Sequence, residues 1–154
     1  MAQQISPSPL TFGWSWPVFG VAAFISTIAA GTFQKRYTNR QVWSACQTIM
    51  ATGLILPIIY PHILMIIAAG LLVGSTFMII TMTGMKEAHR IASPDDVIRH
   101  IAIMTASFAA GQIIGPVFAS SLYFFTKSFS ISLITSSAIL LITIIPLMRL
   151  GHHR

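Results

Sequence analysis

The sequence predicts an all-α integral membrane protein with about five transmembrane helices. Of its 154 residues, 55% are hydrophobic and only 8% are charged, and the mean hydropathy is +0.79. Soluble domains are about one quarter charged, and a soluble fold of this size leaves much of its surface in water. The apolar stretches are each near the roughly 20 residues that cross a bilayer, and the cations gather in the gaps between them.

The first predicted span covers about residues 14–33 and opens with Trp14 and Trp16, aromatic residues suited to a membrane interface. A polar gap follows. Residues 41–85 carry no formal charge, which is too long for one crossing and suits two spans, 42–59 and 63–84. The turn between these two spans is marked by Pro57, Tyr60, Pro61 and His62.

The segment 85–100 is the most polar part of the chain, and it holds all three acids, Glu87, Asp95 and Asp96. We expect water to solvate these acids at the loop. Ser93 and Pro94 are typical of a helix start, as N-cap and first helical residue. A helix beginning here would cross the membrane over about 101–125.

A short turn at Lys127 leads to a fifth span, 129–150, and a tail at 151–154. Eight of the nine Lys and Arg residues then lie on one face of the bilayer, and Lys127 is the exception. By the positive-inside rule this face is cytoplasmic. The tail should therefore be cytoplasmic, and the N-terminal segment 1–13 should lie outside.

Several functions are excluded by the same pattern. The net charge of +6 is divided among interhelical gaps and forms no stripe for nucleic acid. The single cysteine, Cys46, leaves no Cys cluster, and we find no catalytic triad, phosphate loop or zinc-spaced cluster. No acid lies inside a predicted span, whereas a proton-coupled transporter usually places an Asp or Glu there as a proton relay. We therefore expect no catalytic residue, metal or cofactor.

Two groups of residues in the spans are candidates for function. Gly111 and Gly115 have the GxxxG spacing, and Pro116 follows directly, so this stretch is either a close-packing surface or a gating helix that bends. Gln112 is the most polar side chain deep in a span. With Thr105 and Thr81 it is a candidate for the wall of a cavity, although an interhelical hydrogen bond without a ligand is the simpler explanation of Gln112.

The run from 31 to 40, Gly-Thr-Phe-Gln-Lys-Arg-Tyr-Thr-Asn-Arg, resembles the cytoplasmic loop motif of the major facilitator superfamily. Gly31, Arg36 and Arg40 match that motif, whereas Lys35 replaces its acid and Thr38 its second glycine. Residues 74–82 resemble the tenth helix of the family. Residues 104–116 resemble the eleventh, most of all in the YbfB/YjiJ-like branch.

This resemblance implies that the five helices correspond to helices eight to twelve of twelve and form a partial facilitator-type bundle. It further implies secondary transport of a small solute by rocking of helix bundles, in the cytoplasmic (inner) membrane of a bacterium. In that case Arg36 and Arg40 would stabilise one conformation through cytoplasmic contacts. The sequence does not identify the substrate.

Two alternatives follow from the missing first half and seventh helix that this correspondence implies. One is a non-transporting interaction protein whose exposed packing faces bind the missing transporter half or a second copy of the chain. The other is a non-functional transporter remnant, because half a cavity gives no alternating access. In every case the lipid bilayer is an expected partner.

Overall fold

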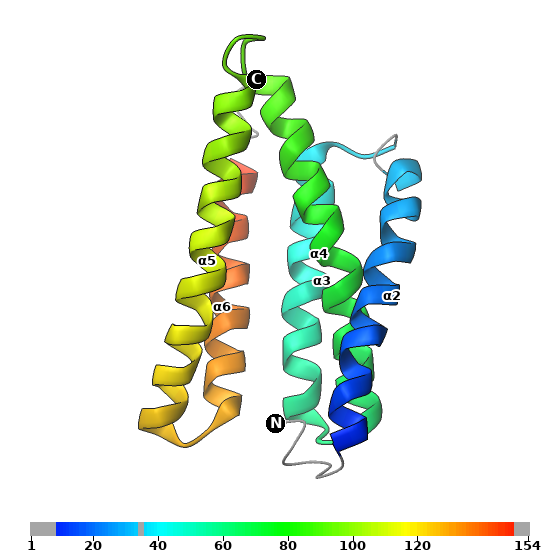
Figure 1. The fold of residues 1–154 in the computed structure, drawn as a ribbon, viewed down its shortest axis with the longest axis vertical. Coiled ribbons are helices and arrows are strands. Elements are labelled where there is room, and N and C mark those ends of the chain that lie inside the picture. The colour runs from blue at the N-terminus through cyan, green and yellow to red at the C-terminus, as the bar shows by residue number, and fades with distance from the viewer. Residues whose placement is uncertain (1–8, 34–35, 150–154) are drawn as a thin grey trace.

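The protein is a bundle of long antiparallel helices. The computed structural model describes residues 9–33 and 36–149, and over these residues it contains no strand. The prediction of an all-α fold is thus confirmed. In chain order the helices are α2 (Pro9–Phe33), α3 (Asn39–Ile59), α4 (Ile63–Ile91), α5 (Val97–Thr126) and α6 (Phe129–Arg149) (Figure 1).

Four of these helices, α3 to α6, are long and apolar enough to cross a membrane. In α2, the part with described side chains contributes a shorter apolar stretch, Pro17–Ile28, and the side chains of Trp14 and Trp16 lie outside the described residues. At a rise of about 1.5 Å per residue, α4 and α5 are each longer than a hydrocarbon core of roughly 30 Å. Their polar ends therefore extend beyond it.

The helices form two groups that share α3 (Figure 1). α4 packs against both α2 and α3, whereas α6 packs against the other side of α3. α5 contacts α6. It also contacts α4, in the part of the two helices toward the α4–α5 turn. The turn before α3, the turn before α5 and the end of α6 all lie at one end of the bundle. Lys127 follows α5 at the opposite end.

Small residues form the interior, and large apolar residues face outward. Phe124 and Phe125, for example, are 67% and 81% exposed. This is the reverse of a soluble core and suits helices that pack through close backbone approach in lipid. The described buried residues include Ala22, Ala23, Ser26, Ala30, Ala51, Thr76, Thr83, Ala88, Ser132 and Ser137.

The closest helix approach is between α2 and α4, at Gly74. A Cβ atom placed on Gly74 would lie 2.7 Å from the backbone oxygen of Phe19. A Cβ on Gly84 would lie 2.9 Å from the Met104 sulfur of α5, and one on Gly53 would lie 3.1 Å from the Leu72 Cβ of α4. Glycine at these positions leaves room for the neighbouring helix to approach closely.

Hydroxyl and amide side chains link helices that the small residues bring close. The Ser137 hydroxyl of α6 donates to the carbonyl of Ala51 in α3 at 3.1 Å. Gln47 Nε2 of α3 donates to Thr143 Oγ1 of α6, also at 3.1 Å. Such bonds are worth about 0.6 kcal/mol on average between membrane helices, so they fix the pairing of α3 with α6 and add little stability.

The helix starts at the polar end differ in detail from the expectation. α5 begins at Val97, and the N-cap is Asp96, which makes no side-chain cap. Pro94 instead lies in a turn that the Asp96 amide closes on the Ser93 carbonyl at 2.9 Å. The Ser93 hydroxyl is bonded to Asp96 Oδ2, which is why it does not cap the helix.

We predict that Gly74→Ala destabilises the bundle and that Gly70→Ala does not. Both substitutions are in α4 and raise helix propensity equally. Of the two, only Gly74 faces the backbone of a neighbouring helix, at Phe19 of α2. Nothing lies within 4 Å of a Cβ at Gly70. The added methyl should cost about 1–3 kcal/mol by overpacking, and the midpoint of thermal unfolding in detergent should fall. Equal midpoints for the two variants would contradict the close approach of α2 and α4.

Candidate functional site

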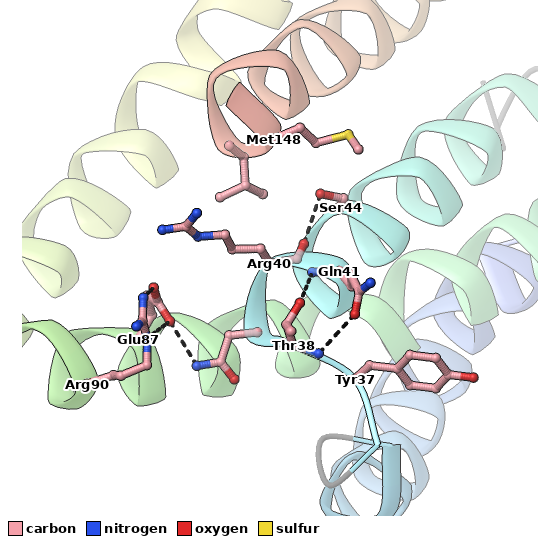
Figure 2. Close-up of a pocket in the computed structure, with 10 residues that line it drawn as sticks. Tyr37, Thr38, Arg40, Gln41, Ser44, Glu87, Arg90 and Met148 are labelled. Carbon is pink, nitrogen blue, oxygen red and sulfur yellow. Dashed lines mark hydrogen bonds and ion pairs between the residues drawn. The ribbon is translucent and has the colours of Figure 1, made fainter. Parts of the chain in front are cut away.

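A polar hollow lies where the start of α3 meets the ends of α4 and α6 (Figure 2). Its volume is about 760 Å³, and it is open to the surroundings. One side carries charged and amide groups, and the α6 side carries two apolar residues. The lining residues are Tyr37, Thr38, Asn39, Arg40, Gln41, Ser44, Glu87, Arg90, Leu147 and Met148.

The start of α3 is held in place by a capping box. Thr38 Oγ1 accepts from the Gln41 amide at 3.3 Å, and the Gln41 side chain accepts from the Thr38 amide at 3.1 Å. These reciprocal bonds satisfy two donors that a helix start otherwise leaves free. The first turn of α3 therefore has a defined position, and it presents Asn39 and Arg40 to the hollow.

Glu87 is at the centre of the polar side. Its Oε2 accepts from Asn39 Nδ2 at 2.9 Å and from Arg90 Nε at 2.9 Å, and its Oε1 pairs with the Arg90 NH2 group. Only 19% of the Glu87 side chain is exposed. The expectation that water solvates Glu87 is therefore wrong, because α3 and the next turn of α4 supply donors instead. The Asn39 bond ties α3 to α4.

The protonation of Glu87 follows from these contacts. Glu87 lies beyond the predicted span 63–84, at the polar end of α4. The hydrogen bonds from Arg90 lower its pKa most, partial burial opposes them, and Asn39 and the charges of Arg90 and Arg40 lower it further. The pKa falls from 4.5 to about 2. The carboxylate is thus ionised at neutral pH and forms an ion pair with Arg90.

The three predicted loop-motif residues do not come together in one site. Arg40 lines the hollow and is half-buried, and its positive charge acts on Glu87. Arg36 is exposed in the turn before α3. Gly31 is exposed near the end of α2, with nothing within 4 Å of a Cβ position. A role for this motif in holding one conformation stays a prediction.

The glycine–proline stretch of α5 has no packing partner among the described residues. Gly111, Gly115 and Pro116 are exposed, and no described atom lies within 4 Å of a Cβ at either glycine. Within the described chain, close packing uses Gly53, Gly74 and Gly84 instead. The gating role of this stretch stays a prediction.

The bare stretch belongs to a face of α5 that is packed at both ends. Met104, Phe108, Gly111, Gly115 and Ala119 recur at three or four residues and so share one face. Phe108 packs on Phe77 of α4, with ring centroids 5.5 Å apart. The Ala119 carbonyl accepts from Ser132 of α6 at 3.2 Å. Between these contacts the face is open.

The three predicted cavity residues have different surroundings. Gln112 is exposed beside the bare face and forms no hydrogen bond with the described residues. The Thr105 hydroxyl bonds the Ile101 carbonyl of its own helix at 2.9 Å. The Thr81 hydroxyl bonds the Phe77 carbonyl of α4 at 3.1 Å. The two threonines therefore have satisfied hydroxyls, and only Gln112 offers free donors and acceptors.

Sequence reasoning missed Asn39, Ser44 and Glu87 as members of one site. A signal existed for part of it, since Glu87 and Arg90 have the spacing of a helical ion pair. Nothing in the sequence places Asn39, 48 residues away along the chain, against Glu87. Among the described residues, no group of three or more His, Cys, Asp or Glu could hold a metal ion.

Apolar helices with small residues inside and large residues outside define an integral, multi-pass membrane protein. The sequence matches, over residues 1–148, the family described as uncharacterised MFS-type transporter YbfB. The chain belongs to this family of major facilitator transporters. No curated protein and no solved structure matches the chain.

We predict that acid weakens the α3–α4 contact through Glu87. Because folding lowers its pKa from 4.5 to about 2, the stabilisation is present above about pH 4.5 and is lost as the pH falls toward 2. Glu87→Gln should therefore lower the unfolding midpoint at pH 7 and reduce its fall between pH 5 and pH 3. The measurement is thermal unfolding in detergent across this range. Asp95→Asn, at an exposed acid in the turn before α5, is the control and should keep the wild-type pH dependence.

Proposed function

We propose that the chain forms one part of a secondary transporter of small solutes. Its helices would correspond to helices eight to twelve of a twelve-helix facilitator, and further helices, of the same or another polypeptide, would complete the solute cavity. Family membership supports a transport role rather than catalysis. The substrate and the coupling ion stay open.

One observation carries this proposal: the central face of α5 is open beside an unsatisfied amide. α5 is 30 residues long and apolar enough to span a bilayer, and Gln112 lies near its middle. An amide facing lipid without a partner costs several kcal/mol. The Gln112 side chain should therefore face water, a solute or a polar group of another helix, and a transport cavity provides such an environment.

The neighbouring glycines support movement at this face. Gly111 and Gly115 leave room for a solute or a sliding helix, and Pro116 removes one backbone hydrogen bond. The aromatic contact of Phe108 with Phe77 would act as the pivot between α4 and α5. Rocking of α5 about this contact would open or close the face.

For orientation, we infer that the end of the bundle with the hollow is cytoplasmic, in the inner membrane of a bacterium. Residues 36–149 contain seven Lys and Arg residues. Five of them lie in the turn before α3, in α3's first turn, at the end of α4 or at the start of α5, namely Arg36, Arg40, Lys86, Arg90 and Arg99. Lys127 is at the other end. Positive residues gather on the cytoplasmic side of bacterial membrane proteins.

The competing function is a non-transporting interaction protein, and the same open face favours it. A helix from a second copy or from another membrane protein could pack on Gly111 and Gly115. Gln112 would then bond that helix and be shielded from water. Water access at position 112 therefore separates the two functions.

We predict that a cysteine at position 112 reacts with a water-soluble maleimide, and that one at position 113 does not. The variants are Gln112→Cys and Ile113→Cys, each with Cys46→Ala, in membranes that contain the expressed chain. Ile113 is 71% exposed and lies on a different side of α5, so it should face lipid. Solutes of a panel that slow labelling at 112 would identify the transported class.

Equal, slow labelling at the two positions would contradict the cavity. If Gly115→Cys then formed disulfide-linked dimers, the interaction function would replace transport. A remnant without function should give slow labelling and no dimer. Each result therefore decides among the three readings.

We predict that Ser93→Cys is protected from an impermeant maleimide added to intact cells, whereas Lys127→Cys is labelled. Both residues are exposed and lie in turns at opposite ends of α5. Permeabilised cells should label both positions, which controls for reactivity. The reverse pattern in intact cells would place the hollow outside and overturn the orientation.

A further inference from the structure

The hollow at the polar end of α3 has more cationic donors than its own acid uses. Both oxygens of Glu87 are occupied, by Arg90 on Oε1 and by Arg90 and Asn39 on Oε2. Arg40 adds a second guanidinium. This guanidinium influences Glu87 by charge alone and forms no hydrogen bond with the described residues, whereas the Arg40 carbonyl accepts from the Ser44 hydroxyl. Two arginines against one carboxylate leave the hollow with a surplus positive charge.

The position of Arg40 favours a bound anion over a solvated side chain. The residue is half-buried, and Figure 2 shows its guanidinium extending into the hollow and away from the Thr38–Gln41 capping bonds. A guanidinium presents five N–H donors in a planar fork that fits phosphate oxygens. The capped start of α3 holds the Arg40 backbone in place, so the side chain leaves the helix on the side of the hollow.

The opposite wall of the hollow is apolar. Leu147 and Met148 of α6 line it, and Met148 is 66% exposed. A free anion gains nothing from such a wall. A molecule with a phosphate attached to hydrocarbon would bond Arg40 and contact Met148 at the same time.

The depth of the hollow fits the same molecule. Arg40 is the second residue of α3, which is apolar enough to span a bilayer, and Glu87 lies just past the predicted span of α4. The hollow is therefore level with the interface, where lipid phosphates lie. Basic pockets between transmembrane helices bind anionic headgroups at this level.

We propose that this hollow binds one anionic phospholipid, with its phosphate on Arg40 and its acyl region against Leu147 and Met148. The lipid would complete the contact among α3, α4 and α6 at this end of the bundle. The proposal does not depend on transport, since it concerns the lipid-level end of the helices and not the open face of α5.

The test is native mass spectrometry of the full chain in detergent, with added phosphatidylglycerol or phosphatidylcholine. We expect the wild-type chain to retain one phosphatidylglycerol in preference to phosphatidylcholine. Arg40→Gln should reduce this retention roughly fivefold, the loss expected for one arginine near an anionic surface. Arg99→Gln, which removes an equal charge from an exposed site at the start of α5, should leave it unchanged. Equal losses in both variants would overturn the site, because net charge would then explain binding.

Two further arms separate the sources of phosphate and guard against misfolding. A large excess of inorganic phosphate should displace little lipid, and Met148→Gln should weaken lipid retention. Full displacement by phosphate with no effect of Met148→Gln would mean a simple anion site and overturn the lipid assignment. Arg40→Lys keeps the charge but loses the fork. If Arg40→Gln fails to fold, this variant should still bind less phosphatidylglycerol than Arg99→Lys, and equal binding would contradict the role of the guanidinium.

Discussion

Close backbone approach is the constraint on which this bundle depends. In lipid, apolar side chains gain nothing by turning inward, so helices associate through van der Waals contact and a few polar bonds. The contact of Gly74 with the Phe19 backbone and the small buried residues along α2, α3 and α4 meet this requirement. The approach of Gly53 in α3 to Leu72 in α4 pairs these two helices in the same way, and Asn39 meets Glu87 at the polar end of that pair.

The polar end of the bundle follows a different rule from the spans. Outside the hydrocarbon core, charged groups and helix caps cost little desolvation free energy, and here they set where α3 begins and how it meets α4. The Thr38–Gln41 capping box sets the start of α3, and Glu87 joins α3 to α4 through Asn39. A carboxylate that stays ionised well below neutral pH keeps this link at any pH that a cell experiences.

Much of the fold could be predicted from the sequence, because apolar length and polar gaps report directly on crossing helices. The helical class and the four long apolar helices follow from this, as does membership of the major facilitator family, which the loop and helix motifs indicated. The candidate functional site was harder to predict than the fold. The bond between Asn39 and Glu87 depends on the relative register of two helices, which hydropathy does not encode. The start of α5 was placed too early, because Ser93 bonds the Asp96 side chain rather than a backbone amide.

The sparse contacts of α5 have a consequence for biogenesis. α3 and α6 pack together although α4 and α5 separate them in the chain, so α6 must reach α3 after α5 has already left the translocon. Until that moment α5 contacts only α4, around Phe77 and Gly84, and its glycine-rich centre is exposed to the surrounding lipid. An insertase or chaperone that shelters apolar segments would therefore have most of the α5 surface available until α6 is in place.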